Sequence, residues 1–200
     1  QSHVTRGREH IEYLKNRFQN VTNIEVDLTS VFETFKKIVP DGSDVDKLNL
    51  SLANTRARLR MTTLYYFAGL HSLLVAGTGN KIEDFGVGFY TKYGDGGVDL
   101  SPIADLMKSE VHLLGSYLKI PESILKASPT DGLFGDDRTD EDQLGASYDE
   151  LEWAMLENEA GKSSDDFSGR EKIVLDIYKR LNTINQHKMT AIPVCFIPNE

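Results

Sequence analysis

Several features that mark other classes of protein are scarce or absent in this sequence of 200 residues. It holds a single cysteine, Cys195, which excludes an internal disulfide and agrees with a reducing compartment. No apolar run approaches the roughly eighteen residues that would indicate a membrane-spanning helix. No basic start followed by an apolar stretch is present, so we predict no secretory signal. These absences predict a cytoplasmic globular protein without a membrane partner.

The net charge of −9 is unevenly distributed along the chain. Residues 131–166 hold 13 acidic and 2 basic side chains, whereas the remainder holds 18 acidic and 20 basic ones. We therefore predict one solvated acidic segment at 131–166, with the rest of the chain able to hold an anionic ligand. Sustained nucleic-acid binding calls for a clustered basic face, which is not found, so we expect no nucleic-acid partner.

Helical periodicity alternates with two strand-like segments, and 40% hydrophobic content is enough for one core. Helices are predicted at residues 4–18, 30–38, 50–69, 103–118, 121–127, 148–156 and 168–182. Strands are predicted at 23–28 and at 73–76, the second being an apolar run typical of a fully buried parallel strand. The alternation predicts a parallel α/β sheet in a single domain, 1–200. Two strands are too few for a stable sheet, and because the chain opens at Gln1 rather than Met, we expect upstream sequence to supply others.

Three arginines at two-residue spacing lie in the predicted helix 50–69. At about 100° per residue, Arg56 and Arg60 share a face, whereas Arg58 lies on a polar stripe that borders the core. The Arg58 guanidinium can hold a phosphate or a carboxylate in a bidentate fork. The spacing alone, however, favours a solvated helix that merely carries charge.

Two glycine-containing loops are candidates for ligand binding. Ligands bind beyond the carboxyl ends of strands in open α/β sheets, where Thr78 can donate its hydroxyl and Glu83 can hold Mg²⁺ beside ATP phosphates. In the next loop, 89–99, three aromatic residues flank Lys92, which can meet a phosphate, while Asp99 can accept from a ribose or an amide. An ordinary turn and an aromatic surface loop remain open as alternatives for these two segments.

Three further candidates are weak when each is taken alone. Lys108 lies in the predicted helix 103–118, where a lone lysine is usually exposed. Thr130 follows Pro129 in what is usually no more than a turn. His187 and Lys188 follow the last predicted helix, where such a pair is more often solvated than catalytic.

Taken together and in order, these stretches resemble the NAD+ synthetase family of N-type ATP pyrophosphatases. The matching pieces are NTRARLRM, VAGTGNKIE, GFYTKYGDGGVDLSPIADLMKSEV, IPESILKASPTDGL, TDEDQLGASYDELE and QHK. They cover essentially all of residues 50–188, and TKYGDGG with its downstream lysine is highly specific. The resemblance implies a Rossmann-like parallel sheet flanked by helices, of the adenine nucleotide alpha hydrolase-like kind, and a homodimer.

The resemblance also implies an activity and a role for each matching residue. The activity is amidation of deamido-NAD+ to NAD+ by ammonia, a carbon–nitrogen ligation that passes through an NAD-adenylate and releases AMP and pyrophosphate. The implied roles are ATP binding by Thr78, Lys108 and Thr130, Mg²⁺ binding by Glu83, and deamido-NAD+ binding by Arg58, Lys92, Asp99, His187 and Lys188. In the family these sites lie at a homodimer interface, so the resemblance implies that the tail 184–200 completes a substrate site shared between subunits.

The sequence departs from the family pattern in two places. The S-G-G-x-D-S loop that holds the ATP phosphates in the family does not occur here, and residues 1–18 resemble the segment that follows it. We therefore expect an N-terminally incomplete chain that does not turn over ATP by itself. The stretch between Glu83 and Lys92 is one residue longer than the family pattern, which bears on the metal geometry at Glu83. Two alternatives stay open, namely the synthetase portion of a glutamine-dependent NAD+ synthetase and a non-catalytic nucleotide-binding relative.

Overall fold

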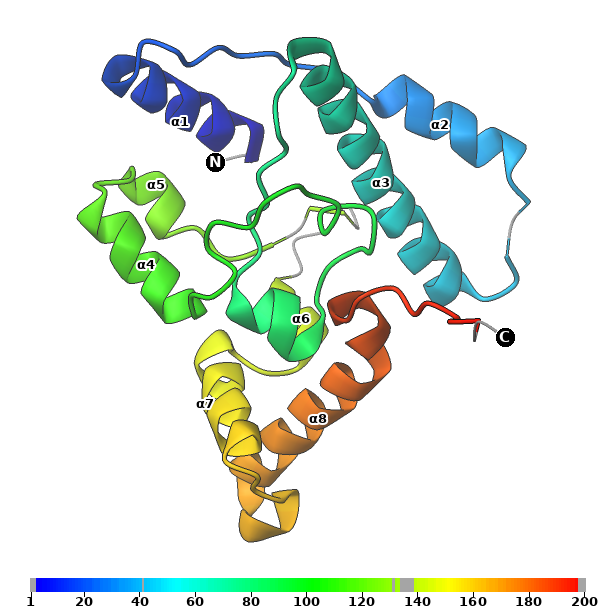
Figure 1. The fold of residues 1–200 in the computed structure, drawn as a ribbon, viewed down its shortest axis with the longest axis vertical. Helices are drawn as coiled ribbons and strands as arrows, with labels where there is room; N and C mark the ends of the chain where they lie inside the picture. The colour runs from blue at the N-terminus through cyan, green and yellow to red at the C-terminus, as the bar shows by residue number, and fades with distance from the viewer. Residues whose placement is uncertain (1–2, 41, 131, 134–138, 198–200) are drawn as a thin grey trace.

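A computed structural model describes residues 3–40, 42–130, 132–133 and 139–197 and shows a predominantly helical chain (Figure 1). The predicted helices are confirmed, although 103–118 begins later, at Lys108, because residues 102–106 form turns. A further short helix, α6, lies within the acidic segment. The helices are α1 (His3–Arg17), α2 (Thr29–Ile38), α3 (Val45–His71), the π-helix η1 (Ile82–Val87), α4 (Lys108–Tyr117), α5 (Glu122–Leu125), α6 (Asp140–Leu144), α7 (Tyr148–Glu159), the 3₁₀-helix η2 (Ser164–Asp166) and α8 (Gly169–Met189).

The main core lies where α7 and α8 pack against each other and against η1 (Figure 1). Apolar residues of α7 recur at helical spacing, as in Leu151, Ala154 and Met155, so that one face of the helix is buried. The buried members of this core are Ile82, Val87, Leu144, Ala146, Tyr148, Leu151, Ala154, Met155, Val174, Leu175 and Tyr178. This core fixes the position of η1, which carries Glu83.

Capping interactions set where α7 begins. Ser147 accepts a hydrogen bond from the backbone N–H of Glu150, and the Glu150 carboxylate accepts one from the N–H of Ser147, which together form a capping box. Arg170 of α8 donates to both oxygens of Glu150 at 2.7 Å. These contacts lower the pKa of Glu150 to about 2, chiefly through the hydrogen bond from Arg170. The start of α7 is thereby held against α8.

The N-terminal helices lie at the opposite end of the molecule from the α7–α8 pair (Figure 1). Helix α2 packs on α3, where the Arg56 guanidinium lies 4.3 Å from the ring centroid of the buried Phe32. Helix α1 is tied to the end of α4 because Tyr13 and Arg17 both donate to the carbonyl of Leu118 at 2.9 Å. Helix α3 begins at an aspartate cap, Asp44, which accepts from the backbone N–H of Lys47.

The predicted parallel sheet is not confirmed. Residues 23–28 form no strand, and the single β pairing within the described residues is an isolated parallel bridge between Ala76 and Leu100. The prediction of a fully buried strand at 73–76 was wrong, because Leu73 and Leu74 are 63% and 69% exposed and only Val75 is buried. An apolar run specifies a tendency to be covered but not a partner, and in this structure no layer covers these two leucines.

Parts of two predicted segments lie outside the described residues, namely Asp131 and 134–138 of the acidic segment and 198–200 of the tail. Within the described part, α8 continues to Met189, so His187 and Lys188 lie in its last turn and not after the helix as predicted. Residues 191–197 have no regular secondary structure. None of the helices described is both long and apolar enough to cross a membrane.

Candidate functional site

The stretch between Glu83 and Lys92, which we predicted to be one residue longer than the family pattern, includes most of the π-helix η1 (Ile82–Val87). Its first turn is held by Asn80, which is 2% exposed and whose side-chain oxygen accepts from the backbone N–H groups of Ile82 (3.0 Å) and Glu83 (3.1 Å). The helix ends at Gly88, whose φ of 63° is left-handed. A π-helix has more residues per turn than an α-helix and is frequent at functional sites. Asn80 therefore fixes the position of Glu83 in the first turn of this helix.

The Glu83 carboxylate is the centre of a partly buried polar cluster. Its Oε1 lies 3.1 Å from the Lys108 Nζ and accepts a hydrogen bond from the Tyr148 hydroxyl at 2.6 Å. Its Oε2 accepts from the backbone N–H of Asn80 at 3.2 Å. The Glu83 and Lys108 side chains are 16% and 22% exposed, so this ion pair is far better shielded from water than a surface pair. The structure thus brings together the predicted metal ligand and one of the predicted ATP-binding residues.

Tyr148 belongs to this cluster and was not predicted from the sequence. It is 4% exposed, and its ring centroid lies 4.5 Å from the Lys108 Nζ. Burial, followed by the charge of Glu83, raises the pKa of the hydroxyl, so the proton stays on Tyr148 and is donated to the carboxylate. The residue lies in the matched stretch TDEDQLGASYDELE, but its contact with Glu83 depends on how α7 packs on η1.

Three of the residues predicted to bind deamido-NAD+ meet in a second group. Arg58 of α3 donates from Nε to the backbone carbonyl of Lys92 at 3.3 Å, and the Lys92 Nζ donates to the backbone carbonyl of His187. Arg58 and His187 are both exposed to solvent. Helix α3, the loop that carries Lys92 and the end of α8 therefore converge at this group.

Lys188 is half-buried, which contradicts the interpretation of a solvated tail. Its Nζ donates to the carbonyls of Gly88 at 2.8 Å and of Tyr90 at 2.9 Å. Burial lowers the pKa of Lys188, and the charge of Asp95 partly opposes that effect. The ammonium group thereby ties the end of α8 to the segment that follows η1.

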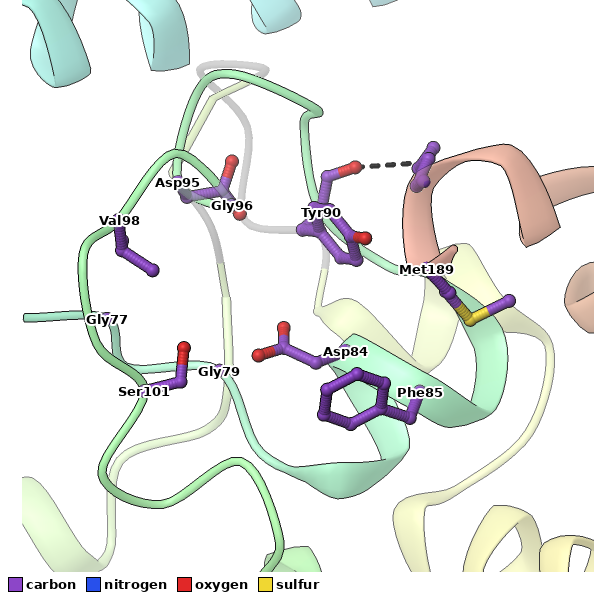
Figure 2. Close-up of a pocket in the computed structure, with 11 residues that line it drawn as sticks. Gly77, Gly79, Asp84, Phe85, Tyr90, Asp95, Gly96, Val98, Ser101 and Met189 are labelled. Carbon is purple, nitrogen blue, oxygen red and sulfur yellow. Dashed lines mark hydrogen bonds between the residues drawn. The ribbon is translucent and has the colours of Figure 1, made fainter. Parts of the chain in front are cut away.

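A small cavity of about 150 Å³ lies between the 77–79 loop, η1 and the end of α8 (Figure 2). The Asp84 carboxylate points into it, towards Gly79 and Ser101. Burial and the nearby charges of Glu83 and Asp95 raise the pKa of Asp84 to about 6. A Cβ atom on Gly79 would lie 2.1 Å from the Asp84 Oδ1, so glycine leaves the space that this carboxylate occupies.

The sequence did not single out Asp84, Tyr90 or Asp95, although all three line this cavity. Burial raises the pKa of Tyr90 to about 12, with smaller effects from the two aspartates. The available signal was the position of Asp84 next to Glu83 and of Asp95 within TKYGDGG. Neither position by itself shows that the two carboxylates face one cavity.

The remaining predicted residues lie apart from the Glu83 cluster. Asp99 accepts from the backbone N–H of Val75 at 2.8 Å and from the Tyr65 hydroxyl at 3.1 Å, so it anchors the chain beside the Ala76–Leu100 bridge. Thr78 is exposed and lines a neighbouring cavity of about 320 Å³ against α3. The Thr130 hydroxyl accepts from the backbone N–H of Gly132 at 3.3 Å. The contacts described join neither threonine to Glu83 or Lys108.

Among known proteins, the family model of NAD synthase matches residues 4–191 of this chain. The chain belongs to the NAD synthase family. One relative, the NH(3)-dependent NAD(+) synthetase of Methanococcoides burtonii, is 36% identical over 182 residues. That alignment covers 86% of this chain and 65% of the relative. The enzyme of the same name from Picrophilus torridus is 47% identical over 135 residues, which is 68% of this chain and 51% of the relative.

Two solved structures share the fold of this chain. The NMN synthetase of Francisella tularensis gives a TM-score of 0.76 at 28% identity and covers 98% of this chain and 73% of its own. The NH3-dependent NAD synthetase of Campylobacter jejuni gives a TM-score of 0.62 at 26% identity, covering 86% and 64%. This chain therefore spans about two thirds or less of the length of the curated relatives described above.

Proposed function

We propose that the protein to which this chain belongs amidates deamido-NAD+ to NAD+ with ammonia and ATP, and releases AMP and pyrophosphate. The observation that carries the proposal is the shielded Glu83–Lys108 pair, which joins the first turn of η1, directly after the 77–81 loop, to the start of α4. A carboxylate for a metal and a lysine for phosphate are the groups that nucleotide activation needs. The names of the relatives, NH(3)-dependent NAD(+) synthetase, support the same reaction.

In the proposed reaction, a carboxylate oxygen of the pyridine ring attacks the α-phosphorus of ATP. The bond between the α- and β-phosphates breaks, and pyrophosphate leaves with that electron pair, giving an acyl-adenylate. Ammonia then attacks the acyl carbon, loses a proton, and AMP leaves as the amide forms. The chemistry needs charge neutralisation and positioning more than a protein nucleophile.

The chain's own residues divide between the two anionic substrates in this proposal. Lys108 neutralises the pyrophosphate that leaves, and Thr78 and Thr130 contribute hydroxyl groups to ATP. The linked group of Arg58, Lys92 and His187, with Lys188 and Asp99 beside it, binds deamido-NAD+. Exposure of Arg58 and His187 supports this assignment, because their side chains are open to a ligand from solution.

Glu83 fits a role as a ligand of Mg²⁺ that arrives with ATP. Magnesium in nucleotide sites is held by one or two carboxylates together with the phosphates, and it supplies positive charge that stabilises the leaving group. Within the described part of the chain, no group of three His, Cys, Asp or Glu side chains is placed to hold a metal. Lys108 and Tyr148 orient the carboxylate for this role.

A second candidate substrate is nicotinate mononucleotide, which would be amidated to NMN. The specific observation that favours it is the likeness to the NMN synthetase of Francisella tularensis, which extends over 98% of this chain. The same carboxylate chemistry would apply, since both substrates carry the pyridine carboxylate. The two candidates differ only in whether the site also accepts the adenylyl half.

The test uses the full-length protein with ATP, Mg²⁺ and ammonium, and measures AMP and pyrophosphate by chromatography. We expect both products with deamido-NAD+ and neither when any one component is omitted. Nicotinate mononucleotide in place of deamido-NAD+ tests the second candidate, and glutamine in place of ammonium tests the glutamine-dependent alternative. Absence of AMP with either pyridine carboxylate would overturn the assignment and favour a non-catalytic nucleotide-binding protein.

We further propose that the enzyme acts in the cytoplasm as a homodimer. The single cysteine and the nucleotide substrates support the compartment. Apolar side chains left exposed around the end of α3 and before the Ala76 bridge, such as Leu70, Leu73 and Leu74, support burial against further protein. Sedimentation of the full-length protein at micromolar concentration tests the dimer, and a monomer would contradict it.

A further inference from the structure

The Tyr148 side chain contacts both members of the Glu83–Lys108 pair. Its hydroxyl donates to the Glu83 Oε1 at 2.6 Å, the same oxygen that receives Lys108 at 3.1 Å. The face of its ring lies 4.5 Å from the Lys108 Nζ, which is a cation–π distance. A hydrogen bond to a charged acceptor is among the stronger ones in proteins, and here it is shielded because Tyr148 is 4% exposed.

The rest of Tyr148 is fixed by the protein core. The residue is the first of α7, directly after the Ser147 cap, and its ring belongs to the apolar core formed by α7, α8 and η1. Its backbone N–H donates to the Glu141 carboxylate at 3.0 Å. The hydroxyl therefore has little freedom, and its position relative to Glu83 is set by rigid elements.

Of the two carboxylates near the Tyr148 hydroxyl, Glu83 is the closer, so the hydroxyl donates from α7 to Glu83. The Asp140 Oδ2 lies 3.4 Å from the Tyr148 oxygen, which is at the long end of hydrogen bonding, whereas Glu83 lies at 2.6 Å. Asn80 holds the other carboxylate oxygen through its backbone N–H at 3.2 Å. Without the hydroxyl, the Glu83 carboxylate loses one of the two side-chain donors to its Oε1 and can rotate towards Lys108, which remains as the other.

We infer that Tyr148 is a positioning residue, whose hydroxyl holds the Glu83 carboxylate and whose ring holds the Lys108 ammonium in the arrangement that binds Mg²⁺–ATP. The inference rests on the proposed function, because it assigns Glu83 and Lys108 to the nucleotide. It predicts that Tyr148 acts through Glu83, so that the effect of removing the hydroxyl disappears when the carboxylate is removed as well.

The experiment is a double-mutant cycle in the full-length protein, with equilibrium binding of Mg²⁺–ATP measured by titration calorimetry. The variants are Tyr148→Phe, Glu83→Gln and the pair together. Tyr148→Phe removes one charge-assisted hydrogen bond, and we expect an affinity about tenfold weaker in the natural background. In the Glu83→Gln background we expect the same change to weaken binding less than about twofold.

Tyr178→Phe is the matched control, because Tyr178 is 2% exposed and belongs to the same core but lies on α8. We expect it to bind Mg²⁺–ATP like the natural protein. Steady-state kinetics provide a second measurement. We expect Tyr148→Phe to raise the KM for ATP and to leave the KM for deamido-NAD+ unchanged.

The outcomes separate the two claims. Tyr148→Phe could weaken Mg²⁺–ATP binding equally with and without the Glu83 carboxylate, or Tyr178→Phe could weaken it as much as Tyr148→Phe. Either result would show a general effect on the core and would overturn the positioning role alone. A natural protein that binds no Mg²⁺–ATP would overturn the proposed function together with this inference. Loss confined to the background that retains Glu83 supports both.

Discussion

At the scale of single residues, Asp84 carries a carboxylate whose pKa is raised to about 6 by burial and by Glu83 and Asp95. A group whose pKa is raised in the folded state favours folding below its unfolded pKa of about 4, and this contribution is lost as the pH rises through about 6. The charged form is thus the less favourable one inside the cavity. The natural protein should lose this part of its stability between pH 4 and pH 6.

Asp84→Asn removes the titrating group and keeps the shape of the side chain. We expect the unfolding free energy of the variant, relative to the natural protein, to increase from pH 4 to pH 7. Urea denaturation of both full-length proteins at four pH values measures the difference. A difference that stays constant over this range would contradict the pKa shift assigned to Asp84.

The sequence led to some site residues and not to others for a physical reason. Glu83, Lys108, Arg58, Lys92 and His187 could be found because each stands in a stretch that resembles the family pattern. Their grouping into the Glu83–Lys108 pair and the linked Arg58, Lys92 and His187 depends on contacts between elements far apart in the chain. Tyr148 is 65 residues from Glu83 and 40 from Lys108, and no periodicity or spacing predicts that contact.

At the scale of elements, the π-helix η1 depends on the fit between its last turn and α8. Asn182 and Asn185 of α8 donate to the carbonyls of Gly86 (2.7 Å) and Val87 (2.8 Å). These carbonyls lie in the last turn of η1, where no following turn supplies a backbone N–H to them. Gly88 follows with a φ of 63°, and a Cβ atom there would lie 2.4 Å from the Asn185 Cβ. Glycine at position 88 therefore permits both the left-handed backbone conformation that ends η1 and the close approach of α8.

Gly88→Ala should destabilise the protein by about 2–4 kcal/mol, because left-handed strain and a clash with α8 add together. Gly161→Ala is the matched control, since Gly161 has a φ of 75° but nothing within 4 Å of its added Cβ. We expect it to cost about 1 kcal/mol from strain alone. Urea denaturation compares the two, and equal losses would contradict the close packing of η1 on α8.

Helices and strands differed in how well the sequence predicted them. Helices α3, α7 and α8 follow from apolar residues at helical spacing, which is a local property of the chain. A strand acquires its structure from a partner, and residues 23–28 and 73–76 find none beyond the Ala76–Leu100 bridge within the described residues. The π-helix was not predicted either, because a six-residue element gives too short a pattern to distinguish one helical period from another.

At the scale of the whole molecule, a helical framework holds the two groups of polar residues that our proposal assigns to ATP and deamido-NAD+. The α7–α8 pair supports the Glu83 side, and the end of α8 together with α3 supports the Arg58–Lys92 side. Both groups lie within residues 4–191, which the NAD synthase family model matches. Because the chain spans 65% or less of the length of the two curated relatives, our proposal assigns the activity to the full-length protein.

The central claim is that a substrate carboxylate is activated by transfer of AMP from ATP. The most direct measurement uses deamido-NAD+ labelled with ¹⁸O in the pyridine carboxylate, incubated with the full-length protein, ATP, Mg²⁺ and ammonium. Attack by the carboxylate on the α-phosphorus leaves one substrate oxygen on the phosphorus, so mass spectrometry should find AMP that carries one ¹⁸O for each NAD+ formed. Formation of unlabelled AMP, or of ADP and phosphate in its place, would contradict the proposed mechanism.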